Sequence, residues 1–351
     1  MAAKLKDVAS LAGVSPATVS QVLNQRARNI RISDATRERV LQAAHQLNYS
    51  PNQAARALRL HKTYSAGIVS FDVNDPMASA RSSHIDRHLT AHGYRTMIAD
   101  AHHDGRLAMQ LARHFLTSRV DGIVLLASSY RPDMAELCEM KARYDLPIVC
   151  VGRDLSQAGI QSFAVDYQTG ARRAAELLLR SGYRRIAVIV GAEDYEPDST
   201  DRLEGARQAC QAYGVEIAPE LIVREREGGW NPQMGYCNMK QLLTLHPLPE
   251  AVLAFDDVTA YGAIRAIFEA GRRVPDDIAV IGFDDLAVSA FYNPPLTTVR
   301  QPVEEESAAV ADYLIRAMEG QVNGAPGCRM FDAQLVIRKS APRDTALESS
   351  L

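Results

Sequence analysis

Acidic and basic side chains gather behind several short apolar runs of this 351-residue chain, where they could hydrogen-bond a small polar ligand. The groups are Asp72-Val73-Asn74-Asp75, Arg153-Asp154, Asp201-Arg202, Asp256-Asp257 and Asp284-Asp285. Carboxylates and arginines pair bidentately with neighbouring hydroxyl groups. These residue types predict a ligand cleft and favour a carbohydrate as its ligand.

An aspartate behind a strand also has a purely structural use, because its side chain often caps the helix that follows. We expect Asp257 and Asp285 to act as caps, which leaves Asp256 and Asp284 for the ligand. The acidic segment 193–201 leaves open a ligand that carries an amino group, although a solvated loop is the simpler interpretation.

The apolar runs alternate with amphipathic stretches from residue 65 onward, which is the pattern of parallel strands joined by helices. Strands are expected at residues 66–71, 96–101, 122–127, 148–152, 186–191, 252–255 and 278–283. The length of this region fits two lobes. Ligands of such sheets bind beyond the carboxyl ends of the strands, which is where the polar groups lie.

The first 62 residues differ in charge from the rest of the chain. They carry +7, whereas residues 63–351 carry −10, within a total of −3. Apolar spacing predicts a helix at 5–12, a turn at Gly13, a second helix from Pro16 to about residue 23, and a third after the cap Ser33. The third helix is expected to bury Val40, Leu41, Ala44 and Leu47. A basic helix-turn-helix of this kind is typical of DNA binding.

The head also carries a specific series of residues. They are Asp7-Val8-Ala9, Ala12-Gly13-Val14-Ser15, Thr18-Val19-Ser20, Val22-Leu23-Asn24, Thr36-Arg37 and Leu47-Asn48-Tyr49-Ser50-Pro51-Asn52. This series resembles the head signature of the lactose-repressor (LacI/GalR) family of bacterial transcription regulators, and the resemblance extends to about residue 340. It implies an N-terminal all-α helix-turn-helix headpiece and an α/β two-lobed effector domain of the periplasmic-binding-protein-like type I fold.

The resemblance also implies domain boundaries. The headpiece is expected at 1–50, the hinge helix or linker at 51–63, the N-terminal lobe at 64–161 and 293–325, the C-terminal lobe at 162–292 and 326–341, and a tail at 342–351. The chain would then cross between the lobes near residues 161, 292 and 325.

By the same resemblance, the second helix enters the major groove, with Pro16, Ala17 and Gln21 at base-reading positions. Gln21 can pair with adenine, and the other two offer only apolar contact, for example to a thymine methyl group. Many family members carry arginine at the Gln21 position, so their operators do not transfer. The other DNA contacts expected in the head are Ser15, Thr18, Ser20, Asn24, Arg28 and Asn52. A solvated basic loop is an equally good interpretation of the arginines in 24–33.

Residues 51–60 are rich in alanine but span only about two helical turns, so this helix is marginal in water. The resemblance makes it a hinge helix that pairs with that of a second subunit in the minor groove. Leu58 would wedge between base pairs there, with Ala55 and Arg59 beside it. A core role for Leu58 is disfavoured because so short a linker has little core to join.

In the effector domain, Arg202, Asp256 and Asp284 match effector-contacting positions of the family, and Arg153 is a weaker candidate. Gly229-Trp230-Asn231 resembles a family segment whose tryptophan packs on a bound sugar. Asn74 at a strand end completes the expected site. A carbohydrate is the favoured effector, with a nucleobase, a nucleoside or an amino-bearing ligand as alternatives.

These observations favour a transcription repressor that binds a palindromic operator as a homodimer, with the direction of the effector response left open. The tail has no leucine heptads, which disfavours a tetramer. An enzyme is disfavoured because no phosphate loop, dinucleotide turn or nucleophile elbow is found, and no cofactor is expected. A solute-binding transport protein is disfavoured by the head and by the lack of a signal peptide, so a cytoplasmic protein without a membrane partner is expected.

Histidines at positions 84, 88 and 92 recur at helical spacing. Such histidines can share a metal, but no carboxylate or cysteine framework accompanies them, so a polar or subunit-interface face is favoured and no metal is expected. The five cysteines are scattered and odd in number, which predicts reduced thiols.

Overall fold

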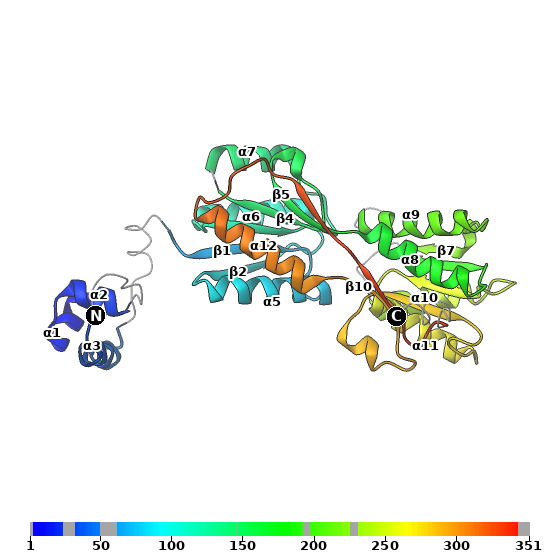
Figure 1. The fold of residues 1–351 in the computed structure, drawn as a ribbon, viewed down its shortest axis with the longest axis horizontal. Coiled ribbons are helices and arrows are strands. Elements are labelled where there is room, and N and C mark those ends of the chain that lie inside the picture. Colours follow the sequence, from blue (N-terminus) through cyan, green and yellow to red (C-terminus); the bar gives the residue numbers. More distant parts are fainter. Residues whose placement is uncertain are drawn as a thin grey trace. The chain divides into compact units, whose positions relative to one another are not determined.

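The computed structural model describes residues 3–23, 32–49, 62–144, 146–191, 197–224 and 231–342, and the chain divides into two compact units, 1–64 and 65–351 (Figure 1). Several sequence predictions lie outside the described residues. These are Asn24, Arg28, Asn52, Ala55, Leu58, Arg59, Trp230 and the C-terminal tail from residue 343.

The head unit contains the three predicted helices, α1 (Leu5–Ala12), α2 (Pro16–Leu23) and α3 (Asp34–Gln46), drawn in blue in Figure 1. Gly13 ends α1 with a left-handed φ of 64°, a conformation that glycine adopts without steric cost. Ser15 Oγ accepts a hydrogen bond from the Thr18 backbone N–H at 3.1 Å and so caps α2. The shared core consists of Val8, Ala9, Ala12, Val19, Val22, Val40, Ala43 and Ala44. The prediction for Leu41 was wrong, because its side chain is 49% exposed and Ala43 is buried instead.

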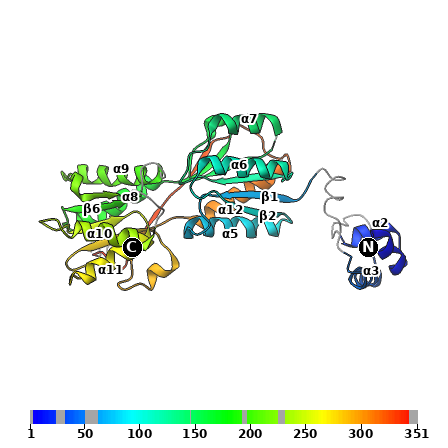
Figure 2. The ribbon, with the colours of Figure 1, turned by 180° about the vertical axis from the view of Figure 1, so that it is seen from behind.

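The first lobe of the larger unit is built on a parallel six-stranded sheet with the order β11-β5-β4-β3-β1-β2. Its strands are β1 (Ser65–Ser70), β2 (Arg95–Asp100), β3 (Gly122–Leu126), β4 (Ile148–Val151), β5 (Gln161–Val165) and β11 (Cys328–Phe331). Its helices are α5 (Pro76–Ala91), α6 (Gly105–Thr117), α7 (Met134–Tyr144) and α12 (Val303–Met318), with the 3-10 turn η1 (Ser156–Ala158). Helices α5 and α12 pack on each other, and α6 packs on α7. Figure 1 shows α12 in front of the sheet, and Figure 2, from behind, shows α6 in front.

The second lobe repeats this plan with a sheet of order β12-β10-β9-β8-β6-β7, in which only β12 runs antiparallel to its neighbour. Its strands are β6 (Ile186–Val190), β7 (Ile222–Arg224), β8 (Ala251–Ala254), β9 (Ala279–Asp284), β10 (Thr297–Arg300) and β12 (Gln334–Val336). Its helices are α8 (Tyr167–Arg180), α9 (Pro197–Ala212), α10 (Pro232–Leu242) and α11 (Asp257–Glu269), with the 3-10 turns η2 (Pro219–Leu221) and η3 (Ala287–Ala290).

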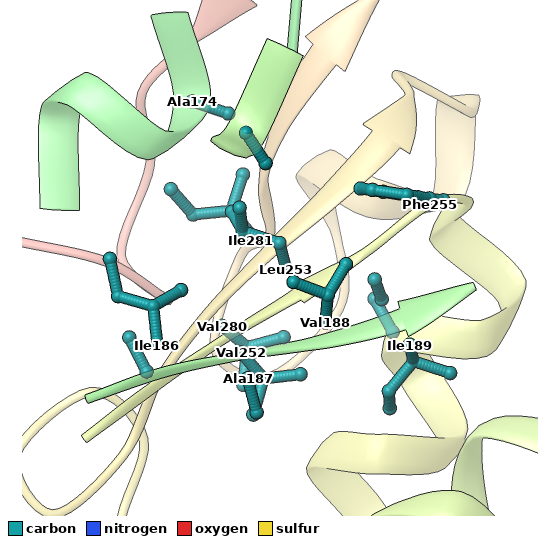
Figure 3. Packing of buried hydrophobic residues seen from close by; sticks show 14 of the residues in the cluster. Ala174, Ile186, Ala187, Val188, Ile189, Val252, Leu253, Phe255, Val280 and Ile281 are labelled. Carbon is teal, nitrogen blue, oxygen red and sulfur yellow. The ribbon is translucent and has the colours of Figure 1, made fainter. Parts of the chain in front are cut away.

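Side chains of the second-lobe sheet alternate between its two faces, as strand geometry requires. Figure 3 shows Leu253 and Ile281 on the side of Ala174 from α8, whereas Val252 and Val280 lie on the other side. Because both faces are covered by helices, the central strands β6, β8 and β9 consist of nearly continuous apolar residues.

All seven predicted strands are present, with ends shifted by one residue or so, but five further strands were not predicted. These five are β5, β7, β10, β11 and β12, which are short and include polar residues. In β10, for example, Thr297 and Thr298 are both buried. The Thr297 hydroxyl accepts from the Arg338 backbone N–H at 2.8 Å, and the Thr298 hydroxyl donates to Asp257 Oδ1 at 2.5 Å. A search for apolar runs misses strands whose buried polar groups are satisfied in this way.

The chain changes sheet between β5 and β6, between β10 and the first-lobe helix α12, and between β11 and β12. The crossings therefore fall after Val165, Arg300 and Phe331, each further along the chain than the expected positions near 161, 292 and 325. The shift follows directly from the unpredicted strands, since β5, β10 and β11 each extend a lobe past its expected boundary.

Candidate functional site

A small cavity of about 30 Å³, with a mouth open to solvent, lies between the two lobes. It is lined by Phe71, Asp75, Met77, Arg81, Ser128 and Ser129 from the first lobe, by Tyr167, Arg202, Asp256 and Asp284 from the second, and by Gln301 from the second crossing. Most of these residues stand at or just after the carboxyl ends of strands or at the start of the next helix. This is the predicted place for a ligand in sheets of this type.

Arg202 on α9 is the buried cation of the second-lobe wall. Its guanidinium carbon lies 4.6 Å from the centre of the Tyr167 ring and 4.3 Å from that of Phe283, and its Nη1 donates to the Phe255 carbonyl oxygen at 2.5 Å. Gly205 makes this placement possible, because a Cβ there would come within 2.0 Å of the Gln168 carbonyl oxygen of α8. The close approach of α9 to α8 thus brings the guanidinium over the Tyr167 ring, a favourable cation–π geometry.

Asp256 and Asp284 bring two carboxyl groups to the same wall. Asp256 Oδ1 accepts from the Thr259 backbone N–H at 2.8 Å, and burial raises the pKa of this carboxyl to about 7. Burial also raises the pKa of Asp284 well above its usual value, although Arg202 acts in the opposite direction. Both shifts arise because a low-dielectric site disfavours the charged form.

The backbone at the end of β9 adopts an uncommon conformation. Asp284 has a φ of 120° and Asp285 a φ of 57°. Residues other than glycine rarely adopt such positive φ angles. Such strain persists only where the surrounding structure over-determines it, and it concentrates at binding and catalytic sites. It turns the two neighbouring aspartates to different partners.

The expectation that Asp257 and Asp285 cap helices was wrong, whereas Asp256 and Asp284, which were left for the ligand, both line the cavity. Asp256, not Asp257, caps α11. Asp257 braces the loop after β9, because its carboxylate accepts from Leu286 N at 2.8 Å, from Ser289 Oγ at 2.5 Å and from Thr298 Oγ1 at 2.5 Å. Burial raises its pKa to about 6. Asp285 caps no helix and pairs with Arg300 at 2.6 Å and Arg338 at 2.5 Å.

Two other predicted site residues do not line this cavity. The exposed Asn74 donates from Nδ2 to Asp72 Oδ1 at 3.2 Å, and Arg153 donates from Nη2 to the Tyr130 carbonyl oxygen at 3.2 Å. Asp75, from the predicted group at residues 72–75, does line the cavity. The structure adds lining residues that the sequence analysis missed, namely Phe71, Met77, Arg81, Ser128, Ser129, Tyr167 and Gln301. Ser128 and Ser129 directly follow the predicted strand 122–127. The expectation that ligand-binding residues lie just beyond the carboxyl ends of strands would therefore have found them. Arg81 and Gln301 carry no such signal.

His84 and His88 lie on α5 as their spacing predicts, and His92 is the C-cap residue of this helix. His88 Nε2 is 3.0 Å from Asp312 of α12, His84 Nδ1 is 3.0 Å from Arg87 Nη2, and the His88 and His92 rings stack at 5.6 Å. Among the described residues, no group of three or more histidine, cysteine, aspartate or glutamate side chains could hold a metal ion.

In the head unit, α2 presents the residues that the sequence analysis assigned to DNA. Pro16 and Ala17 are exposed, and Thr18, Ser20 and Gln21 are partly exposed, while Val19 and Val22 face the core. The Ser15 and Thr18 hydroxyls are 2.9 Å apart and share a hydrogen bond at the start of the helix. The arrangement offers small and polar side chains on one face, as a helix that enters a groove requires.

Both units resemble known protein families. Residues 4–52 match the family model described as bacterial regulatory proteins, lacI family, and residues 175–341 match a periplasmic binding protein-like domain. The HTH-type transcriptional repressor PurR of Haemophilus influenzae strain PittEE is 32% identical over 96% of this chain and 98% of its own length. The chain belongs to the lacI family. The predicted fold of a helix-turn-helix head and a periplasmic-binding-protein-like body is thereby confirmed.

Other relatives agree with this lacI-family assignment. The HTH-type transcriptional repressor CytR of Escherichia coli strain K12 is 32% identical over 97% of this chain and 96% of its own. The structure of a lac repressor dimer bound to operator and the anti-inducer ONPF matches with a TM-score of 0.82 at 29% identity, over 97% of this chain and 99% of that one. The lacI-family chain is a transcriptional repressor and not an enzyme. Within its described residues, no helix is both long and apolar enough to cross a membrane.

Proposed function

We propose that this repressor binds a palindromic operator as a homodimer and that a hydroxyl-rich small molecule, with a carbohydrate favoured, changes its operator affinity from the interlobe cavity. The observation that carries the proposal is the convergence of Arg202, Asp256 and Asp284 on a cavity that Tyr167 and Phe71 also line. Carboxylates and a guanidinium suit hydroxyl groups, and aromatic faces suit the C–H side of a sugar ring.

The proposed DNA contacts divide into base-reading and positioning groups. Pro16, Ala17 and Gln21 of α2 read base edges, and Gln21 selects adenine. Ser15, Thr18, Ser20, Asn24, Arg28 and Asn52 contact the phosphate backbone and set the register. The hinge residues Ala55, Leu58 and Arg59 act in the minor groove of a kinked duplex.

A second class of effector is favoured by the acidity of the cavity. Asp75, Asp256 and Asp284 all line it, and burial raises the pKa of each. Of the two lining arginines, Arg81 is already paired with Glu306 at 2.8 Å. A ligand with an amino group, including an amino sugar or an amino-bearing nucleobase or nucleoside, would supply the missing positive charge or hydrogen-bond donors.

The DNA half of the proposal is tested by selecting duplexes from a random pool with the full chain. We expect a palindromic site, one half for each subunit. Gln21→Ala should relax selection at one base pair in each half-site and leave the rest of the site unchanged. Selection of an asymmetric single site, or of no site, would contradict the proposal.

The effector half is tested with matched pairs of compounds: glucose and glucosamine, galactose and galactosamine, inosine and adenosine. Thermal stabilisation of the full chain reports binding, because a ligand that binds the folded state raises Tm. The selected duplex then reports coupling, for which ~1–3 kcal/mol is typical. Arg202→Ala and Asp284→Ala should abolish the Tm shift, and Asn74→Ala, outside the cavity, should keep it. A Tm shift that survives both cavity substitutions would place the effector elsewhere.

A further inference from the structure

A continuous chain of hydrogen bonds joins the two lobes at the cavity. Gln301 Nε2 donates to Asp284 Oδ1 at 2.5 Å, and Gln301 Oε1 accepts from Arg81 Nη2 at 2.6 Å. Arg81 Nε in turn donates to Glu306 Oε2 at 2.8 Å. Asp284 ends β9 of the second lobe, whereas Arg81 on α5 and Glu306 on α12 belong to the first. The chain of bonds therefore runs from the second-lobe wall of the cavity to two packed helices of the first lobe.

The three residues at the centre of this chain are buried. Arg81 is 2% exposed, Gln301 5% and Glu306 0%. Water cannot readily replace a lost partner at such positions, so each polar group depends on the others. The ion pair differs in this respect from exposed pairs, which contribute little.

Gln301 is held in one orientation. Its Oε1 accepts from both Arg81 Nη2 and the Tyr167 hydroxyl, the latter at 3.3 Å, which occupies both lone pairs of the amide oxygen. Its amide nitrogen must then face Asp284. Arg81, fixed by Glu306, thus determines that the cavity presents an N–H donor beside the Asp284 carboxyl.

The ion pair has a second arrangement within reach. Glu306 Oε1 is buried and has no hydrogen-bond partner among the described residues. If Arg81 Nη2 left Gln301, the guanidinium could engage both oxygens of Glu306 in the bidentate geometry that arginine and carboxylate prefer. An Arg81–Glu306 pair closed on itself would be the second state of the kind of two-state element that coupling requires.

We propose that Arg81 and Glu306 are positioning residues of the effector response, acting through Gln301 on the contact between α5 and α12. A ligand group that occupies Asp284 Oδ1 displaces the Gln301 amide, Arg81 closes on Glu306, and α5 shifts against α12. Helix α5 follows β1, which begins at Ser65 where the head unit ends. The inference rests on the proposed effector role of the cavity.

The test needs no effector, because Asp284→Ala removes the acceptor of Gln301 directly. Backbone hydrogen exchange of the full chain is measured by mass spectrometry, with peptides from α5 and α12 as the readout. We expect Asp284→Ala to change exchange in both helices by about threefold or more, since exchange reports local opening. In the background Arg81→Leu/Glu306→Leu, the same substitution should leave α5 and α12 unchanged. Both partners are replaced together because removal of one would leave a buried unpaired charge.

The control is a more exposed ion pair of the same lobe, between Arg113 of α6 and Glu136 of α7 at 2.6 Å. In the background Arg113→Leu/Glu136→Leu, Asp284→Ala should still alter α5 and α12. If the Arg81→Leu/Glu306→Leu variant does not fold, Gln301→Ala takes its place, because it interrupts the same chain of hydrogen bonds. In the Gln301→Ala background, Asp284→Ala should likewise leave hydrogen exchange in α5 and α12 unchanged.

Two results would overturn the proposal. One is an unchanged exchange pattern in α5 and α12 after Asp284→Ala in the natural chain. The other is a change of the same size in every background, because a double-mutant cycle then shows no coupling. Failure of the compound panel to raise Tm would count against the proposed function and leave this exchange result unaffected.

Discussion

The DNA-facing helix of the head and the cavity of the body hold their polar side chains in opposite ways. On α2, Pro16 and Ala17 are exposed and Gln21 is partly exposed. In the cavity, Arg202 is tied to the Phe255 carbonyl and to two rings, and Asp284 is bonded to Gln301. The cavity residues support the fold as well as the site, so we expect substitutions there to change stability and substitutions on α2 to change recognition alone.

The largest effect is expected from Asp257→Ala. Three donors, from Leu286, Ser289 and Thr298, would lose their acceptor in a buried region. Each buried unsatisfied group costs ~1–3 kcal/mol, so the loss of three bonds should lower the free energy of unfolding by about 3 kcal/mol or more. Urea denaturation measures it. A loss below about 1 kcal/mol would show that this network is not structural.

A smaller effect of a different kind is expected from Gln21→Ala. Discrimination of one base pair in each half-site should weaken by ~1–3 kcal/mol, because a bidentate base contact is lost. Binding to the selected duplex and to single-base variants measures this, and the free energy of unfolding should stay within about 0.5 kcal/mol of the parent. A large fall in stability would remove the contrast between the two regions.

The pH dependence of stability should report the buried carboxyl of Asp256. Its pKa rises on folding from 3.8 to about 7, so the folded state binds the proton more tightly. The protonated Asp256 carboxyl therefore contributes to the free energy of unfolding. This contribution is fully present below the pKa of the unfolded state and is lost as the pH rises through the pKa of the folded state. The free energy of unfolding falls by up to about 1.4 kcal/mol per pH unit in that range. Urea denaturation at pH 5 and pH 7.5 should show a steeper loss in the parent than in Asp256→Asn. Equal slopes would contradict burial as the cause.

The smallest effect is expected from Leu41→Gln on α3. The side chain is 49% exposed, so the free energy of unfolding of the head should change by no more than about 0.5 kcal/mol. Val40→Ala, at a fully buried neighbouring position, is the matched control and should destabilise the head by ~1 kcal/mol or more. Circular dichroism during thermal unfolding compares the two.

Local patterns were sufficient for the head and for the location of the cavity. The helices α1 to α3 follow from apolar spacing, a turn glycine and cap residues, all within a few positions of one another. The strand-end rule likewise predicted that Asp256 and Asp284 meet at one edge. Neither pattern could predict which of Asp256 and Asp257 caps α11 and which accepts hydrogen bonds from the loop after β9. The direction of the backbone after β8 decides between these two roles.

Long-range partners account for most of what the sequence analysis missed. Arg81 and Gln301 meet across 220 positions, and Gln301 belongs to a crossing whose position depends on the unpredicted strand β10. A buried arginine or glutamine is stable only with its partners in place, and those partners are visible only in the folded chain. The composition of the cavity therefore had to come from the structure.

The three changes of sheet in the described chain have a consequence for how such proteins can be recombined. The head is one contiguous segment, so exchanging it between relatives takes a single junction near residue 64. Either lobe, by contrast, is assembled from separate segments interleaved with those of the other. Grafting one lobe would require three simultaneous junctions. A new DNA specificity is therefore far easier to acquire by exchanging the head than a new ligand specificity is by exchanging one lobe.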